Sequence, residues 1–87
     1  MGKQIQDKIL KYNVVFQLEP EGGYTVIVPS LRGCVTYGET FEEARVMAID
    51  AIQGFVASLE EDNEEIPNDE KSVVSTIDIR SSDFALA

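Results

Sequence analysis

Two segments of alternating polarity, joined by a pair of glycines, constrain the fold of this chain most strongly. Residues 12–18 and 24–28 place apolar side chains at every second position, which is the period of a β-strand. Between them, Gly22 and Gly23 supply the positive φ angles that tight turns require. The pattern predicts an antiparallel hairpin at the start of the fold.

A third short strand, about residues 34–37, and then a long helix are predicted after the hairpin. Thr40 and Glu43 have the spacing of a capping box, in which the threonine oxygen accepts from the Glu43 N–H and the Glu43 carboxylate accepts from the Thr40 N–H. Residues 41–59 carry an apolar stripe at the helical period, so this helix is expected to pack on the sheet. The stripe consists of Phe41, Ala44, Ala48, Ala51, Ile52, Phe55 and Leu59.

The last periodic segment, residues 73–79, alternates between apolar and polar positions and predicts a fourth strand. The expected architecture is α+β in the order β-β-β-α-β, a single domain over residues 1–87 with a core at 11–80 and a tail at 81–87. One helix covers only one face of such a sheet. The other face, which includes some of Val15, Ile27, Val74 and Thr76, is therefore expected to contact a partner or a second copy in a dimer or tetramer.

The charge of the chain restricts its partners. Sixteen acidic residues against seven basic ones give a net charge of −9. Nucleic-acid backbones are bound through Lys and Arg, so direct nucleic-acid binding is not expected. A cationic partner, or solubility through self-repulsion, fits this charge better.

The absence of histidine removes most nucleophilic and zinc chemistry, including Ser-His-Asp and Cys-His catalysis. Cys34, the only cysteine, has no base to activate it and is interpreted as a small buried strand residue rather than a nucleophile. A lone cysteine forms no disulfide framework, which favours a reducing cytoplasm. The longest apolar run is four residues, too short for a signal peptide or membrane span.

The segment from Glu19 to Ala44 contains EGGYTVIVPSLRGCVTYGETFEEA and resembles the HicB family of antitoxins. The stretch GCVTYGETFEEA is the most specific part, and the resemblance extends over roughly residues 11–80. The sequence departs from the family pattern at Ser30 and Arg32, which replace an acidic residue and a proline, and at Arg45, where an apolar residue is common. These changes bear on a partner surface rather than on the fold.

The resemblance implies a partial ribonuclease-H-like fold with three antiparallel strands, one long helix and a fourth strand. It also implies that the chain binds and occludes a small basic HicA-like toxin, an RNA-cleaving protein that uses a histidine. Many family members carry a C-terminal DNA-binding domain, but only residues 81–87 follow the fourth predicted strand here. We therefore expect a cytoplasmic antitoxin-like protein that acts by binding, without catalytic residues, cofactor or metal.

Two sets of residues are candidates for partner binding. The first is a helix flank off the core stripe, which is either ordinary edge packing or an interface patch. The second is the acidic run that begins at the end of the helix, which is either a solvated loop or a means of steering a basic toxin. The candidate residues are Val46, Ile49 and Val56 on the flank, and Glu60, Glu61, Glu64 and Glu65 in the acidic run.

Two alternatives to the antitoxin function remain. The first is a stand-alone oligomeric module of the same fold, serving regulation or scaffolding without a toxin. The second is a metal-dependent, ribonuclease-H-like nuclease, which requires carboxylates that converge on Mg²⁺. The available carboxylates are Glu19, Asp50 and Asp78, and their places in the predicted elements give no reason for them to converge.

Overall fold

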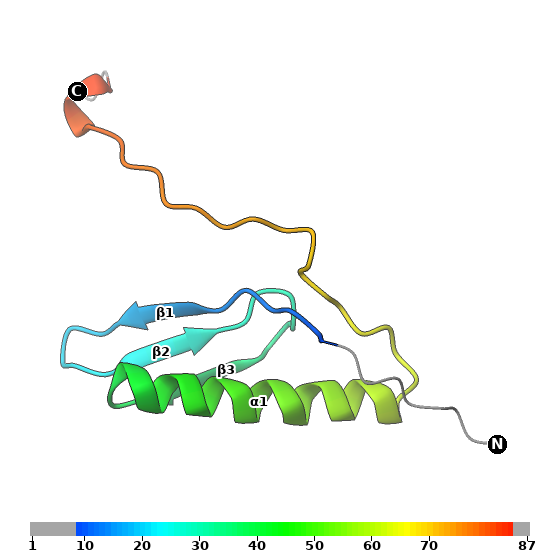
Figure 1. The fold of residues 1–87 in the computed structure, drawn as a ribbon. Helices are drawn as coiled ribbons and strands as arrows, with labels where there is room; N and C mark the ends of the chain where they lie inside the picture. The colour runs from blue at the N-terminus through cyan, green and yellow to red at the C-terminus, as the bar shows by residue number, and fades with distance from the viewer. Residues whose placement is uncertain (1–8, 85–87) are drawn as a thin grey trace.

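A computed structural model describes residues 9–84 and places three strands and one helix in two layers (Figure 1). β1 (Val15–Leu18), β2 (Tyr24–Ile27) and β3 (Val35–Gly38) form an antiparallel sheet in the order β1-β2-β3. α1 (Phe41–Glu61) lies across one face of this sheet, and a three-residue 3-10 helix (Ser81–Asp83) follows much later. The α+β class is confirmed. The predicted tail, residues 81–87, extends beyond the described residues, as does most of the unassigned segment 1–10.

The predicted hairpin is confirmed, with a shorter first strand. β1 begins at Val15 rather than at Tyr12, and its register with β2 runs from Val15 opposite Ile27 to Leu18 opposite Tyr24. Gly22 and Gly23 have φ angles of 100° and 83°, a region that glycine adopts at little cost. The turn therefore forms where the two glycines lie.

The cap at the start of α1 differs from the prediction in one contact. Thr40 has extended backbone angles, and its hydroxyl oxygen accepts from the Glu43 N–H at 3.0 Å, as predicted. The Glu43 carboxylate accepts from the N–H of Glu39 at 2.7 Å, one residue before the expected donor. Both contacts close the first turn, and acidic Glu42 and Glu43 lie at the positive end of the helix dipole.

The core lies between α1 and the sheet in two adjoining clusters. Val26, Ala44 and Ala48 form the first, and Phe16 and Tyr24 pack against it. The second is centred on Val28, Leu31 and Cys34, and the distal half of the predicted stripe packs there. Val56, predicted to lie off the stripe, also packs against this cluster, together with Ala51, Ile52, Phe55 and Leu59.

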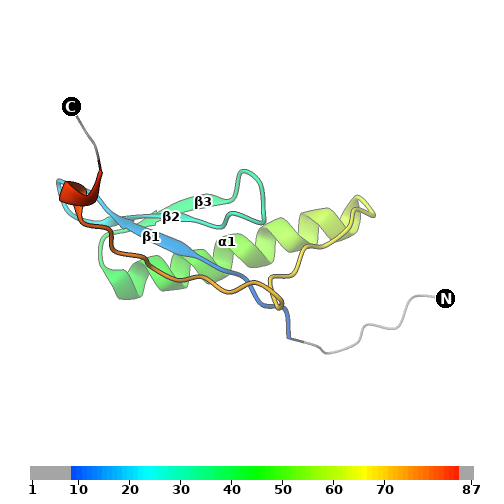
Figure 2. The same cartoon turned by 90° about the horizontal axis from the view of Figure 1, so that it is seen from above.

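The predicted fourth strand is absent from the sheet. Residues 72–80, named here the C-terminal arm, are irregular chain that is separate from the sheet in Figure 1, although in the view from above they project over β1 (Figure 2). Val73 is 92% exposed and Ile77 is 79% exposed, so the alternating side chains pack on nothing in the described chain. Alternation marks a segment that fits a sheet, but a strand also needs a neighbouring strand that supplies hydrogen bonds.

The sheet face opposite α1 is open. Val15, Val35 and Tyr37 are each more than two-fifths exposed on this face, and half-buried Ile27 lies between Val15 and Val35 in the register. Val74 and Thr76, which were expected on the same face, lie on the C-terminal arm instead. The open face is thus smaller than predicted, because the fourth strand is not part of the sheet.

Candidate partner-binding surface

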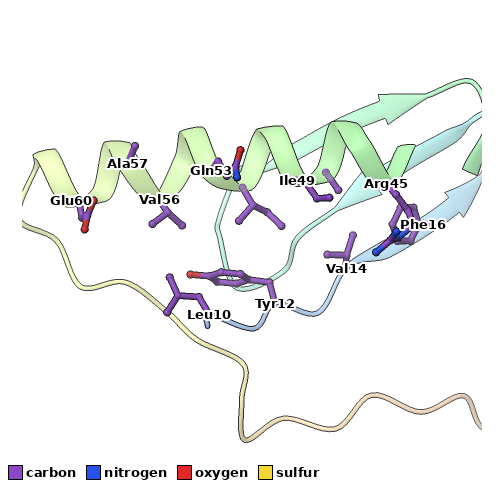
Figure 3. Close-up of a pocket in the computed structure, with 12 residues that line it drawn as sticks. Leu10, Tyr12, Val14, Phe16, Arg45, Ile49, Gln53, Val56, Ala57 and Glu60 are labelled. Carbon is purple, nitrogen blue, oxygen red and sulfur yellow. The ribbon is translucent and has the colours of Figure 1, made fainter. Parts of the chain in front are cut away.

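A groove of about 650 Å³ lies between α1 and the chain leading into β1 (Figure 3). It exists because α1 packs mainly against β3 and β2, which leaves the inward side of β1 partly uncovered. One wall carries apolar and aromatic side chains from the β1 side, and the other carries aliphatic side chains of α1. The walls include Tyr12, Val14 and Phe16 on one side, and Ile49, Ile52 and Val56 on the other.

Three of the predicted partner-binding residues line this groove: Ile49, Val56 and Glu60. Ile49 is 50% exposed, so the helix flank is only partly packed. Val46 is 63% exposed and lies on α1 outside the lining of the groove. The flank therefore combines packing, at Val56, with an exposed apolar surface, at Val46 and Ile49.

The other predicted acidic residues lie away from the groove. Glu61 is exposed at the end of α1, and Glu64 and Glu65 are exposed in the loop that follows, where they border a second, smaller hollow. The last turn of α1 contains no basic residue. Because the C-terminal end of a helix is already negative, this acidic end has a negative potential that nothing within the turn offsets.

Sequence reasoning missed the opposite wall of the groove. Tyr12, Val14 and Phe16 appeared only as the alternating residues of a strand, with no sign that the helix leaves them partly open. Arg45, noted as a departure from the family pattern, also lines the groove. The alternation predicts that these side chains share one face of the sheet. Which strand α1 leaves uncovered depends on where the helix lies over that face.

Asp69 does not behave as a solvated member of the acidic run. It is 7% exposed, and its carboxylate accepts from the Asn13 N–H at 2.9 Å and from the Ser30 hydroxyl. Its own N–H donates to the Lys11 carbonyl at 2.8 Å. Asp69 therefore fastens the loop after α1 to both the chain before β1 and the loop between β2 and β3.

These contacts predict an acid-sensitive step in stability. The hydrogen bonds from Ser30 and then Asn13 lower the pKa of Asp69. A lowered pKa stabilises the fold at neutral pH, and this stabilisation is lost as the pH falls through the folded-state value. Urea unfolding should show a steeper loss of stability between about pH 5 and about pH 2 for the wild type than for Asp69→Asn.

Asp50→Asn is the matched control for this prediction, because Asp50 is exposed on α1. It should leave the pH dependence of unfolding close to that of the wild type. An Asp69→Asn variant with the same pH slope as the wild type would show that these contacts do not contribute to stability.

The Tyr12 hydroxyl is a buried polar group beside the groove, without a hydrogen-bond partner among residues 9–84. Burial and, secondarily, the nearby Asp69 carboxylate raise the pKa of Tyr12, so the phenol stays protonated at neutral pH. It is therefore a hydrogen-bond donor in an otherwise apolar wall, between Leu10 and Val14 (Figure 3).

Cys34 lies in the second core cluster with Val28 and Leu31 and is 4% exposed. Burial raises the pKa of its thiol, which disfavours the reactive thiolate. Its backbone N–H donates to Leu31 and its carbonyl accepts from Val28, which closes the loop between β2 and β3. These contacts support the structural interpretation of Cys34.

The carboxylates considered for metal binding are held on different parts of the fold. Asp50 lies on α1, Asp78 lies on the C-terminal arm, and Glu19 follows β1, where it accepts from the Thr25 hydroxyl at 2.5 Å. Within residues 9–84, no three His, Cys, Asp or Glu side chains form a group that could hold a metal ion. Over the same residues, α1 is not apolar enough to cross a membrane.

The fold and groove define a small α+β domain with a partly open apolar surface. Several known proteins are similar to it in sequence. A family model described as the HicB-like antitoxin of bacterial toxin-antitoxin systems matches residues 12–85. A UPF0150 protein of Thermoplasma acidophilum is 42% identical over 60 residues, covering 69% of this chain and 87% of that protein. A UPF0150 protein of Synechocystis is 35% identical over 63 residues, covering 72% of this chain and 80% of that protein.

An antitoxin is among the similar proteins. Antitoxin HicB 1 of Photorhabdus laumondii is 42% identical over 60 residues, covering 69% of this chain but only 39% of that antitoxin. The chain belongs to the HicB-like antitoxin family of bacterial toxin-antitoxin systems. The resemblance found in the sequence is confirmed, and membership of this family implies a toxin as the class of partner.

Proposed function

We propose that this chain is an antitoxin that binds a small basic HicA-type toxin and covers its RNA-cleaving surface. The family supports a toxin as partner. The observation that carries the choice of a basic toxin is the acidic end of α1, which adjoins the apolar groove at Glu60. Apolar contact area supplies affinity, and complementary charge supplies speed of association and selectivity.

The charge distribution favours a cationic partner over simple solubility. Evenly spread charge would be enough for solubility, whereas here the residues from Glu39 to Glu70 include eleven acidic side chains and only one basic one, Arg45. A cationic surface placed at the end of α1 would interact favourably with the helix dipole and with the acidic side chains together. It would also compete directly with RNA for the same basic groups on the toxin.

Binding rather than catalysis is the proposed mode of action, in the cytoplasm and without metal or cofactor. The burial of Cys34 and the separation of Glu19, Asp50 and Asp78 support it. A stand-alone oligomeric module is the second candidate. The exposed apolar residues of the open face favour that candidate, because they suit contact with another copy as well as with a toxin.

Coexpression tests the proposed function. If a short, basic, histidine-containing protein is encoded beside this gene, coexpression of the two should restore growth and yield a copurifying complex. Toxicity that persists at excess of this chain, or the absence of such a neighbouring gene, would favour the stand-alone module.

Ile49→Glu tests the role of the helix flank. The substitution places a charge on a half-exposed side chain that lines the groove. We expect toxin binding, measured by calorimetry, to weaken at least ~10-fold, because burial of an unpaired charge costs more than the ~1.4 kcal/mol that a factor of ten represents.

Ser58→Glu is the matched control, since it adds the same charge on the opposite side of α1, at an exposed position nine residues along the helix. It should leave the affinity near the wild-type value. Unchanged toxin affinity and oligomer mass in Ile49→Glu would show that the flank serves only packing.

A further inference from the structure

The C-terminal arm has the pattern of a strand but no strand beside it in the described chain. Among residues 9–84, its one backbone hydrogen bond toward the body is local, from the Ser72 N–H to the Asp69 carbonyl. At the same time, β1 is an edge strand of the sheet. We propose that the arm of one copy pairs along the free edge of β1 in a second copy, and that the second copy returns its own arm, to form an arm-exchanged dimer.

The side chains of the arm suit this position. Its first alternate set, Val73, Ser75, Ile77 and Ile79, is mainly apolar, while Val74, Thr76 and Asp78 lie on the other side. Val73, Ile77 and Ile79 are all at least 63% exposed. Burying a large aliphatic side chain contributes about 1.5–3 kcal/mol, so pairing offers a substantial gain that the isolated chain lacks.

The receiving edge has the complementary shape. The groove lies on the helix side of β1, lined by Val14 and Phe16 on one wall and by Ile49 on the other (Figure 3). A strand added outside β1 would direct alternate side chains toward this groove, because side chains point to the two faces of a sheet in turn. The mainly apolar set of the arm would fill the groove, and the more polar set, which includes Val74, would extend the open face.

The geometry at the start of the arm favours a second copy over the arm's own sheet. Asp69 is held by hydrogen bonds to Lys11, Asn13 and Ser30, so the place where the arm leaves the body is fixed. From there the chain diverges from its own β1 and stays separate from it in Figure 1. Reciprocal exchange between two such arms forms a closed, two-fold symmetric contact in which the β1 edge of each copy is paired.

Charge also permits this contact between two acidic copies. Residues 71–80 contain two basic side chains, Lys71 and Arg80, and one acidic side chain, Asp78. The arm itself, residues 72–80, contains only Asp78 and Arg80 as charged residues and has no net charge, in a chain whose net charge is −9. It is a part of the molecule that can approach the acidic body of another copy without like-charge repulsion.

Light scattering with proline variants tests the pairing. The wild type should have twice the 9.6-kDa mass of the chain, and Ser75→Pro/Thr76→Pro should reduce it to that of a monomer. Proline has no backbone N–H to donate. Because the N–H groups of adjacent strand residues point to opposite edges of the strand, one of the two prolines always removes a hydrogen bond to β1. Ser81→Pro/Ser82→Pro, just beyond the arm, should remain dimeric.

Cross-linking of mixed copies distinguishes exchange from closure on the same chain. A chain with Gln17→Cys, on β1, is mixed with a separately tagged chain with Thr76→Cys, on the arm, and treated with a short bis-maleimide. The wild type gives the background of cross-linking, which should be low because Cys34 is buried. Covalent heterodimers are expected. Two results would overturn the proposal: a monomeric wild type, or a dimer that survives the arm prolines.

A further result would also contradict exchange. If mixing gives no heterodimer but a Gln17→Cys/Thr76→Cys chain cross-links within itself, the arm folds onto its own sheet. If the chain is monomeric alone and its arm becomes protected only when a basic toxin is added, the toxin occupies the edge instead. The first three measurements need no toxin, so their outcome is independent of the proposed antitoxin function.

Discussion

Gly38→Ala is expected to destabilise the fold by about 3 kcal/mol or more, at the upper end of the cost of overpacking. A Cβ atom at Gly38 would lie 2.4 Å from both the Cα and the N of Ala44, and these are backbone atoms of α1. The helix cannot shift easily there, because Ala44 is fully buried and its N–H donates to the Thr40 carbonyl at the cap. Gly38 therefore sets how closely α1 approaches the sheet.

Urea unfolding followed by circular dichroism measures this effect. Gly54→Ala is the matched control, since Gly54 lies within α1 and a Cβ atom there meets no atom within 4 Å. It should raise the free energy of unfolding by roughly 0.5–1 kcal/mol, the gain from replacing glycine inside a helix. Equal stability of Gly38→Ala and the wild type would show that α1 is free to move away from β3.

Neutralising Glu60, Glu61, Glu64 and Glu65 to glutamine should slow toxin association at least ~10-fold at low salt and flatten its dependence on salt. The four side chains are exposed at or just beyond the negative end of α1. Their loss removes the field that attracts a basic partner before contact. Stability should rise at the same time, because the last turn has no basic residue to offset these charges.

Stopped-flow association at several salt concentrations measures this effect. A control variant, Glu21→Gln/Glu39→Gln/Glu42→Gln/Asp50→Asn, removes the same charge from the hairpin turn, from the connection between β3 and α1, and from the first half of α1. Its association rate should fall much less. An unchanged rate for the first variant, or equal slowing in both, would show that the acidic end of α1 does not steer the toxin.

Local signals in the sequence were enough to predict most of the fold. Gly22 and Gly23 specify the hairpin turn, and Thr40 specifies the start of α1, since each acts on residues within one turn of chain. The donor predicted for the Glu43 carboxylate was the Thr40 N–H, and the observed donor is the Glu39 N–H. The two groups are neighbours at the same helix end, so the spacing alone does not distinguish them.

The errors concern relations between distant segments. The alternation of residues 73–79 predicts a strand, but it does not say which edge, or whose edge, the strand pairs with. Asp69 appeared to be one more charge in an acidic run, because its contacts to Asn13 and Ser30 join residues 56 and 39 positions apart. The groove likewise depends on where α1 lies over the sheet.

Inhibition of RNA cleavage by a purified partner toxin tests the proposed antitoxin activity most directly. Titrating this chain into a fixed amount of the basic, histidine-containing neighbour should abolish cleavage at a fixed molar ratio, and the two proteins should elute as one complex. Cleavage that continues undiminished at a large excess of this chain, with both proteins eluting separately, would contradict it.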